Sequence, residues 1–232
     1  MKSKHPQNTR RPYVIETEQL VLDTEQLFYD SKISSIPSSI PLSTVRNVFI
    51  LKGRENEATG VHVRVRSADN VIYSCILTCL HVLKSKQYAT TIVARNSFFH
   101  TKLSPDKVYI RARDQDLVVC AMKDIPPYRG MDIRKTDPQR VKVLQNPDGS
   151  GIRVSEGSVL RYDYPTLFHN ASTLPGSSGG AVISKSKNNK AVLSHIHCQT
   201  VTSESWRANI AISISVMNPL LKEHGFSWVS SY

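Results

Sequence analysis

The sequence predicts an all-β protein. Short apolar runs separated by turn residues recur through the middle of the chain, and helical periodicity is nearly confined to its two ends. A chain of 232 residues is long enough to bury a good core as one all-β unit or as two small ones. The runs that we expect to form strands include residues 48–51, 60–65, 71–77, 91–94, 108–110, 117–122, 191–193 and 209–214.

The N-terminal residues 1–44 have a different pattern. The first dozen residues are polar and basic, and residues 17–23 and 24–30 form a near-repeat offset by seven positions. This repeat predicts a helix of roughly four turns with Leu20 and Leu27 on one face. Two heptads are too few for a coiled coil, so we expect the helix to pack on the rest of the protein.

Two further segments lie outside the predicted strands. Residues 34–41 are rich in serine and proline and are expected to form a linker. Residues 216–223 follow Ser215, contain Pro219 near their start and precede Gly225. This order is typical of a short helix, because proline suits the first turn and glycine suits the residue after the last.

The stretch from residue 173 to 182 carries the strongest chemical signal. It reads Thr-Leu-Pro-Gly-Ser-Ser-Gly-Gly-Ala-Val, and Ser178 is the candidate nucleophile. Gly176, two residues earlier, lets the backbone turn so that its N–H group and that of Ser178 converge on a developing oxyanion. A Gly/Ser cluster between apolar runs is also typical of a plain turn, so this interpretation depends on partners elsewhere in the chain.

A serine hydroxyl needs a general base and an acid that orients the base. His81 follows a predicted strand, and Asp116 comes directly before another; Asp114 is the alternative acid. Each residue alone would pass for a strand-end histidine, a turn aspartate or a turn serine. Three matches in the order histidine, aspartate, serine, each with its own flanking context, favour a catalytic triad.

The Thr-x-x-His, Asp-aliphatic and Gly-x-Ser-Gly-Gly elements, in that order, resemble the chymotrypsin-like (trypsin-like, PA clan) serine proteases over residues 45–226. The resemblance implies two six-stranded antiparallel barrels, with a short C-terminal helix and no cofactor or metal. It implies one barrel over residues 45–128 and the second over 129–232, and the basic, helical extension and linker expected from the residues themselves occupy 1–44. It also implies that a serine endopeptidase cleaves a protein or polyprotein substrate through an acyl-enzyme.

The residue before the nucleophile separates this chain from the digestive members of that family. In those enzymes an acid at this position pairs with a new N-terminus when the zymogen is cleaved, and here the position is Ser177. In this respect the chain resembles bacterial glutamyl endopeptidases and viral processing proteases, which fold in an active form. We therefore expect no activation by cleavage of that kind.

The same resemblance implies a specificity pocket that accepts glutamate or glutamine. Ser172 stands where trypsin-like members carry an acid, so a basic preference is not expected. Thr173 and His197 match the threonine and histidine that meet an acidic or amide side chain in glutamyl endopeptidases and picornaviral proteases. His195 is an alternative to His197, and both can also be ordinary strand histidines. The neighbouring positions Cys198, Gln199 and Thr200 complete the expected substrate-binding set.

The chain is basic, with a formal net charge of +11 and a pI near 9.6. Clustered lysine and arginine can form a nucleic-acid surface or attract acidic substrates. No RNA-binding motif with interleaved aromatics accompanies the charge. A basic nucleic-acid-binding module and a pseudoprotease scaffold are therefore the alternative functions, and the complete triad argues against the second.

The four cysteines Cys75, Cys79, Cys120 and Cys198 lie in or beside apolar runs. We expect reduced thiols, which together with the lack of an apolar signal region predict a cytoplasmic enzyme. No run approaches the roughly 18 apolar residues of a membrane span, so no membrane contact is expected. The sequence does not determine the oligomeric state.

Overall fold

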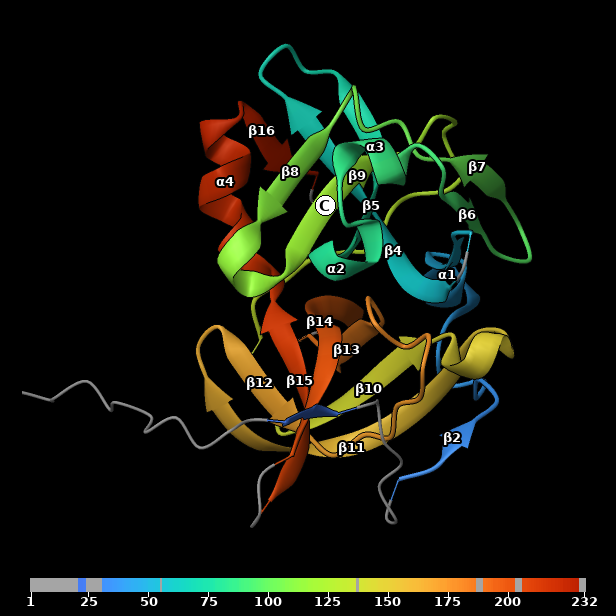
Figure 1. Ribbon diagram of the computed structural model, residues 1–232, viewed down its shortest axis with the longest axis vertical. Helices are drawn as coiled ribbons and strands as arrows, with labels where there is room; N and C mark the ends of the chain where they lie inside the picture. Colours follow the sequence, from blue (N-terminus) through green and yellow to red (C-terminus); the bar gives the residue numbers. More distant parts are fainter. Residues whose placement is uncertain are drawn as a thin grey trace, which may run out of the picture.

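The computed structural model describes residues 21–23, 31–54, 56–136, 138–186, 190–202 and 206–229. Two antiparallel sheets, each of eight strands, lie one above the other (Figure 1). None of the helices in these ranges has the length and apolar character needed to cross a membrane. The all-β prediction is confirmed. The helices are short: α1 (Leu42–Val45), α2 (Leu80–Leu83), α3 (Lys86–Ala89) and α4 (Met217–Glu223).

The N-terminal sheet curls into a barrel that its strand pairings leave partly open. Its strand order is β7-β6-β3-β4-β5-β9-β8, and β16 pairs with β4 beside this path. The curl brings Leu103, just after β7, into a bridge with Met122, just after β9. The strands are β3 (Val48–Lys52), β4 (Glu57–Ser67), β5 (Ile72–Cys79), β6 (Val93–Arg95), β7 (His100–Lys102), β8 (Tyr109–Ala112), β9 (Leu117–Ala121) and β16 (Phe226–Trp228).

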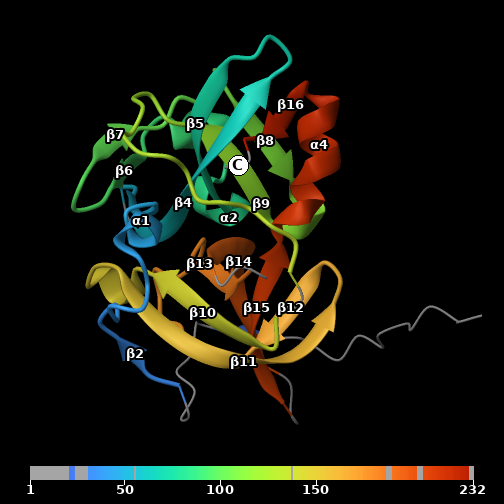
Figure 2. The same cartoon turned by 180° about the vertical axis from the view of Figure 1, so that it is seen from behind.

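The C-terminal sheet is a closed six-stranded barrel. It closes because β14 pairs with β13 on one side and with β15 on the other, after the path has run through β10, β11 and β12. The short strand β2 (Ile33–Ser34) joins the outside of this barrel along β11 (Figure 2). The predicted double barrel is confirmed. The six strands are β10 (Arg140–Gln145), β11 (Arg153–Asp163), β12 (Thr166–His169), β13 (Ala181–Lys185), β14 (Ala191–Thr202) and β15 (Arg207–Ser213).

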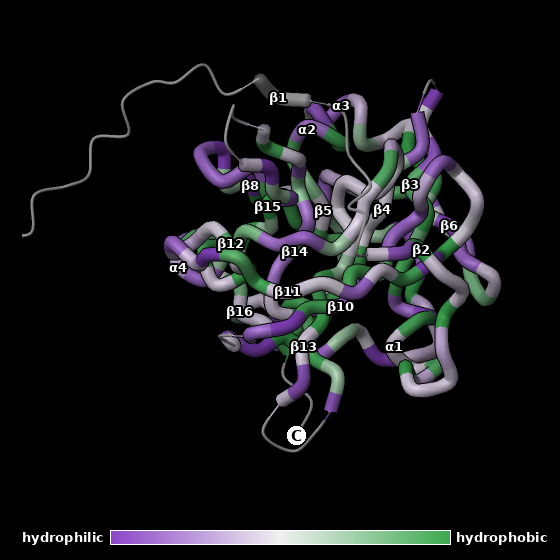
Figure 3. The backbone as a smooth tube through the Cα atoms, turned by 90° about the horizontal axis from the view of Figure 1, so that it is seen from below, coloured by the Kyte–Doolittle hydropathy of each residue, from purple (hydrophilic) through white to green (hydrophobic). Residues whose placement is uncertain are grey.

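One hydrophobic core runs through both sheets. It includes Val61 and Leu77 of the N-terminal sheet together with Leu144 and Ile196 of the barrel, all of them fully buried. Hydrophobic residues follow the inner strands, and hydrophilic residues gather at the turns (Figure 3). Burying each such side chain contributes roughly 1.5–3 kcal/mol. The two sheets are therefore fixed against each other by shared apolar packing.

The helix predicted over residues 17–30 is wrong where the structure describes it. Residues Val21–Asp23 form β1, which pairs antiparallel with β14 through Val21 and Thr202. At this end β14 extends beyond β13, whose last partner on it is Ile196. Backbone groups on an extended edge need hydrogen-bond partners, and β1 supplies them. The rest of the predicted helix, including Leu20 and Leu27, lies outside the described residues.

The predicted C-terminal helix is confirmed as α4, with a 3₁₀ turn over Ile214–Val216 before it. Gly225 follows the helix at φ +75°, a conformation that favours glycine. The helix packs against β8 and β16 (Figure 1). The C-terminal segment therefore covers the N-terminal sheet, although it follows the last strand of the other barrel.

Three buried histidines give the fold a dependence on pH. Burial, followed by the charge of Arg64, lowers the pKa of His62 to about 3, and burial lowers that of His195 to about 4. Burial, followed by His197 and His195, lowers the pKa of His169 well below its ordinary value. All three imidazoles are therefore neutral at neutral pH.

We predict that the free energy of unfolding decreases as the pH falls below about 6.5. In that range the three histidines become protonated in the unfolded chain, whereas their lowered pKa values keep them neutral in the folded protein. The sign follows from the lowered pKa values, and each histidine contributes up to roughly 1.4 kcal/mol per pH unit. Urea unfolding at a series of pH values between 7.5 and 5 measures the loss. His195→Gln should make the dependence shallower, and an unchanged slope in that variant would contradict the neutral buried state.

Candidate functional site

A cavity of about 570 Å³ lies where the two sheets meet, and both His81 and Ser178 line it. His81 comes from α2, and Ser178 comes from the loop before β13, so each sheet contributes one of the two residues. Lys84, Tyr88 and Pro175 also line this cavity. The structure thus brings the predicted base and the predicted nucleophile to one solvent-accessible space.

His81 is held by Asp116 on an adjoining segment. β5 ends at Cys79 and pairs with β9 at Leu117, which places the residues that follow and precede these strands together. Asp116 Oδ1 accepts from the backbone N–H of His81 at 2.9 Å, and Oδ2 pairs with His81 Nδ1 at 2.6 Å. An ionised carboxylate only accepts, so Nδ1 carries the proton and Nε2 is left as the basic nitrogen. Asp116, rather than Asp114, makes these contacts.

Asp116 adopts an uncommon backbone conformation to make these contacts. Its φ is +52°, in the left-handed region that aspartate tolerates better than most residues. Its carbonyl accepts from Leu80 N at 2.9 Å, which anchors the first residue of α2 as well. The side chains of His81 and Asp116 are 49% and 35% exposed, so the pair remains open to solvent on one side.

The loop that carries Ser178 is a tight turn. Ser177 N donates to Leu174 O at 3.0 Å, and Ser177 Oγ accepts from Leu174 N at 3.1 Å. Gly176 has φ +96°, and a Cβ atom there would lie 2.4 Å from Asn146 O. Only glycine fits this backbone, because a side chain would be strained and would also clash. The loop is therefore shaped by its own hydrogen bonds and by close packing.

Thr59 of β4 fixes this loop to the N-terminal sheet. Its backbone N–H donates to Ser178 O at 2.9 Å, and its hydroxyl donates to Gly176 O at 2.8 Å. The Thr59 carbonyl accepts from Thr78 Oγ1 at 2.7 Å. A Cβ atom on Gly179 would lie 1.9 Å from the same carbonyl, so the loop and β4 are in direct contact. Thr59 thus links the serine loop to the sheet that carries the histidine.

The half-buried Ser178 also contacts the C-terminal barrel. Its hydroxyl donates to Cys198 O of β14 at 3.2 Å. The two glycines that follow Ser178 pair with His197: Gly179 N donates to His197 O at 2.8 Å, and His197 N donates to Gly180 O at 2.9 Å. The predicted pocket residue His197 is therefore tied by its backbone to the residues next to Ser178.

The structure turns Ser172 toward the N-terminal segment. Its hydroxyl donates to Ser31 O at 2.6 Å, and its backbone N–H donates to Ser31 Oγ at 2.8 Å. Gln145 Nε2 donates to Ser172 O at 2.9 Å. These bonds hold the segment before β2 against the barrel.

Thr173 belongs to a buried polar group centred on Asn209. The Asn209 Oδ1 atom accepts from the hydroxyls of Thr173, at 3.1 Å, and Thr200. Its amide donates to Ala171 O at 2.6 Å. Thr173, Thr200 and Asn209 are no more than 1% exposed, whereas Gln199 is exposed. The structure therefore places Thr173 and Thr200 together and leaves Gln199 at the surface.

The two candidate pocket histidines have different neighbours. The ring of His197 meets that of His169 edge-to-face, with centroids 5.7 Å apart. The ring of His195 packs on Tyr162 at 5.7 Å, and its Nδ1 pairs with Ser194 Oγ at 2.9 Å. Both histidines are buried. The ring of His197 thus meets that of another histidine, and the ring of His195 meets that of a tyrosine.

Three residues around the site were not identified from the sequence. Thr59, His169 and Asn209 belong to none of the recognisable motifs. Thr59 is one of several threonines in strands. His169 of β12 and Asn209 of β15 are far apart in the sequence, and they lie opposite each other because these two strands pair in the closed barrel. A pattern along the chain carries no signal for contacts of this kind.

Comparison with known proteins assigns the geometry to a family. A family model described as a trypsin-like peptidase domain matches residues 58–192. A search of curated proteins finds no match.

Solved structures of proteases share the fold. A serine endoprotease from Yersinia pestis has a TM-score of 0.60 at 19% identity, over 82% of this chain and 67% of that one. The inactive form of Rv3671c from M. tuberculosis has a TM-score of 0.57 at 14% identity, over 82% and 94%. A Glu endopeptidase has a TM-score of 0.57 at 13% identity, over 88% and 97%.

Proposed function

The chain belongs to the trypsin-like peptidase family of serine endopeptidases, and we propose that it cleaves its protein substrates through Ser178, His81 and Asp116. The observation that carries this proposal is the single cavity lined by both His81 and Ser178, with Asp116 bonded to the far nitrogen of the imidazole. Nucleophile, base and orienting acid each occupy a position that suits the role.

In the proposed reaction, His81 Nε2 takes the proton of Ser178 Oγ as that oxygen attacks the scissile carbonyl. Asp116 keeps the ring in the required tautomer and stabilises the imidazolium that forms. The imidazolium then protonates the leaving amine, which leaves an acyl group on Ser178. A water molecule, activated by the same nitrogen, hydrolyses the ester and restores the serine.

We assign the oxyanion hole to the backbone N–H groups of Gly176 and Ser178. The amides of two neighbouring residues help to fix the shape of this loop: Ser177 N donates to Leu174 O, and Gly179 N donates to His197 O. The bond from the Thr59 hydroxyl to Gly176 O supports this assignment, because it fixes the orientation of the adjacent peptide group. Donors held in advance stabilise charge without reorganising during the reaction.

The proposed enzyme is active as folded. In zymogens of the digestive type an acid beside the nucleophile acquires its partner on cleavage, whereas Ser177 already has one in Leu174 N. Its loop is also supported by Thr59 of the neighbouring sheet. The loop conformation therefore requires no new N-terminus.

We predict that Ser178→Ala and His81→Ala each lower peptide-bond cleavage by roughly three or more orders of magnitude in full-length, untrimmed protein, because they remove members of one coupled unit. Asp116→Asn should cost somewhat less. Peptide hydrolysis measures the rate, and circular dichroism checks the fold. Asp114→Asn is the matched control and should retain activity. Near wild-type turnover of the Ser178→Ala protein would rule out this mechanism.

We further propose that cleavage follows glutamate or glutamine. Thr173 lies in the buried polar group centred on Asn209, and the buried His197 is tied by its backbone to Gly179 and Gly180, which follow the nucleophile. Hydroxyl and imidazole groups can bond a side-chain carboxylate or amide. No acid occupies position 172, where an arginine or lysine side chain would need one.

A peptide library should therefore show glutamate or glutamine before the cut. Thr173→Val and His197→Leu should each flatten this preference by roughly ten- to two-hundred-fold, since an unpaired polar group costs about 1–3 kcal/mol. His195→Leu is the control, because that ring packs on Tyr162, and it should change selectivity less. A profile dominated by arginine, lysine or bulky apolar residues would contradict the pocket while leaving the triad intact.

A second activity, contact with nucleic acid, is favoured by one surface. A groove of about 1420 Å³ beside β10 and β13 is lined by several basic residues. Arg134, Lys135, Arg140, Lys185 and Lys190 are exposed there, whereas Lys142 pairs with Glu156. We call these five residues the basic groove. Clustered positive charge of this kind attracts a phosphate backbone.

Single-stranded RNA should bind the Ser178→Ala protein at low salt and dissociate as salt rises. Replacing Arg140 and Lys185 together by glutamate should weaken binding by about tenfold or more and reduce the salt dependence. Lys107→Glu is the matched control, because this exposed lysine is not among the residues that line the groove. A gel-shift assay that shows equal loss in the control, or no binding, would exclude the basic groove as an RNA site.

We also propose that the enzyme acts in a reducing, cytosolic compartment. All four cysteines are free and buried. Unpaired buried thiols are typical of proteins that fold under reducing conditions.

A further inference from the structure

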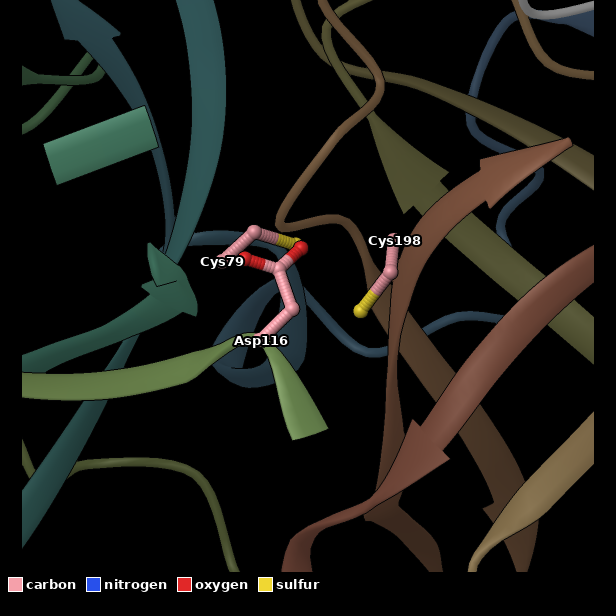
Figure 4. A group of neighbouring side chains, drawn as sticks. All are labelled: Cys79, Asp116 and Cys198. Atoms are coloured by element: carbon pink, nitrogen blue, oxygen red, sulfur yellow. The ribbon is translucent and has the colours of Figure 1, made fainter. Parts of the chain in front are cut away.

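Two cysteines lie beside the proposed acid of the triad. Cys79 ends β5, and Cys198 lies on β14 of the other barrel; they are 0% and 2% exposed. Their sulfur atoms and a carboxylate oxygen of Asp116 all lie within 4.8 Å of one another. Figure 4 shows the three side chains gathered at the junction of the two sheets. The proposed reaction uses Asp116 and neither thiol.

This group, which we call the Cys–Asp cluster, has the donor set and nearly the size of a zinc site. Zinc binds cysteine sulfur at about 2.3 Å and carboxylate oxygen at about 2.0–2.2 Å, in a tetrahedron. Ligand atoms around such an ion are therefore about 3.5–3.8 Å apart. Atoms within 4.8 Å of one another need to close by only about 1 Å to reach that geometry. The two thiolate ligands also favour zinc over calcium or magnesium.

An ion can reach the cluster from the side of the catalytic pair. The two sulfur atoms are buried, but the Asp116 side chain is 35% exposed and that of His81 is 49% exposed. Three protein ligands leave a fourth position for water, which is the arrangement of an exchangeable site rather than a closed structural one. The cluster is thus accessible in the folded protein.

We propose that Cys79, Cys198 and Asp116 bind one Zn²⁺ ion, and that this ion switches the peptidase off. The inhibitory part rests on the proposed triad. A carboxylate that binds zinc is withdrawn from His81 Nδ1, so the imidazole loses the partner that sets its tautomer and stabilises its protonated form.

The binding step balances without oxidation or reduction. Each S–H bond is replaced by a Zn–S bond, two protons leave to solvent, and the bond from Asp116 to His81 gives way to a Zn–O bond. No electron is transferred, so no oxidant is required. When a chelator removes the ion, the two thiolates take up protons from solvent and Asp116 can bond His81 again.

Cobalt provides a direct test of the site that does not depend on activity. Full-length Ser178→Ala protein, kept reduced with a phosphine and freed of metal, is titrated with Co²⁺. A thiolate-to-cobalt charge-transfer absorption that saturates at one ion per chain, and that zinc abolishes, is expected. The absorption should be lost in Cys79→Ser and in Cys198→Ser and retained in Cys120→Ser, another buried free cysteine. Absence of the absorption, or its survival in both ligand variants, would overturn the site.

The second arm measures peptide hydrolysis by the wild-type protein. Zinc should lower the rate at least tenfold, with recovery on addition of a chelator, and the residual rate of Cys79→Ser should not respond to zinc. Equal inhibition of Cys79→Ser and wild type would overturn the switch. If the wild-type protein and every variant lack peptidase activity while the cobalt absorption is present, the proposed function fails and the metal site stands. Native mass spectrometry of each variant verifies folding and the number of bound ions.

Discussion

The docking of the serine loop on β4 is the constraint on which the site depends. His81 and Asp116 are held by the N-terminal sheet and Ser178 by the other, so the packing of one sheet on the other determines their relative position. Thr59 makes the connection with both its backbone N–H and its hydroxyl, and Gly179 lies too close to its carbonyl for any side chain to fit. The shared apolar core keeps β4 in place. A small shift of this strand would therefore move the loop and the proposed oxyanion donors together.

Buried polar groups also order the interior of the C-terminal barrel. Asn209 accepts from two threonine hydroxyls and donates to Ala171 O, so its capacity for hydrogen bonds is largely used. His169 accepts from Ala171 N at 3.2 Å and meets the ring of His197. Buried groups of this type specify one arrangement, because any alternative leaves a donor or acceptor unpaired. The proposed pocket is thereby shaped before a substrate arrives.

The sequence predicted the parts of the site that are encoded locally. The glycines around Ser178, the strand before His81 and the strand after Asp116 are all readable along the chain, and the structure brings their residues to one place. It did not predict β1, because the edge that β1 covers exists only where β14 extends beyond β13. For the same reason, the sequence did not predict the contacts of Thr59 and His169 or the proximity of the free cysteines Cys79 and Cys198. Each depends on contacts between strands that are distant in sequence, for which side-chain periodicity carries no information.

Asp116 contacts His81 and also lies close to the sulfur atoms of Cys79 and Cys198. One carboxylate oxygen bonds the imidazole and the other bonds the backbone of the same residue, which fits an acid that orients a base. The buried thiols of Cys79 and Cys198 lie within 4.8 Å of an oxygen of the same carboxylate. Burial, followed by interactions with Cys198 and Asp116, raises the pKa of the Cys79 thiol well above its ordinary value, so the sulfur is neutral in the metal-free protein. A neutral thiol leaves the carboxylate available to His81, whereas the proposed metal ion, once bound by the two thiolates, competes with His81 for it. In the proposed scheme, the same three side chains support the triad when no metal is bound and withdraw its acid when zinc is bound.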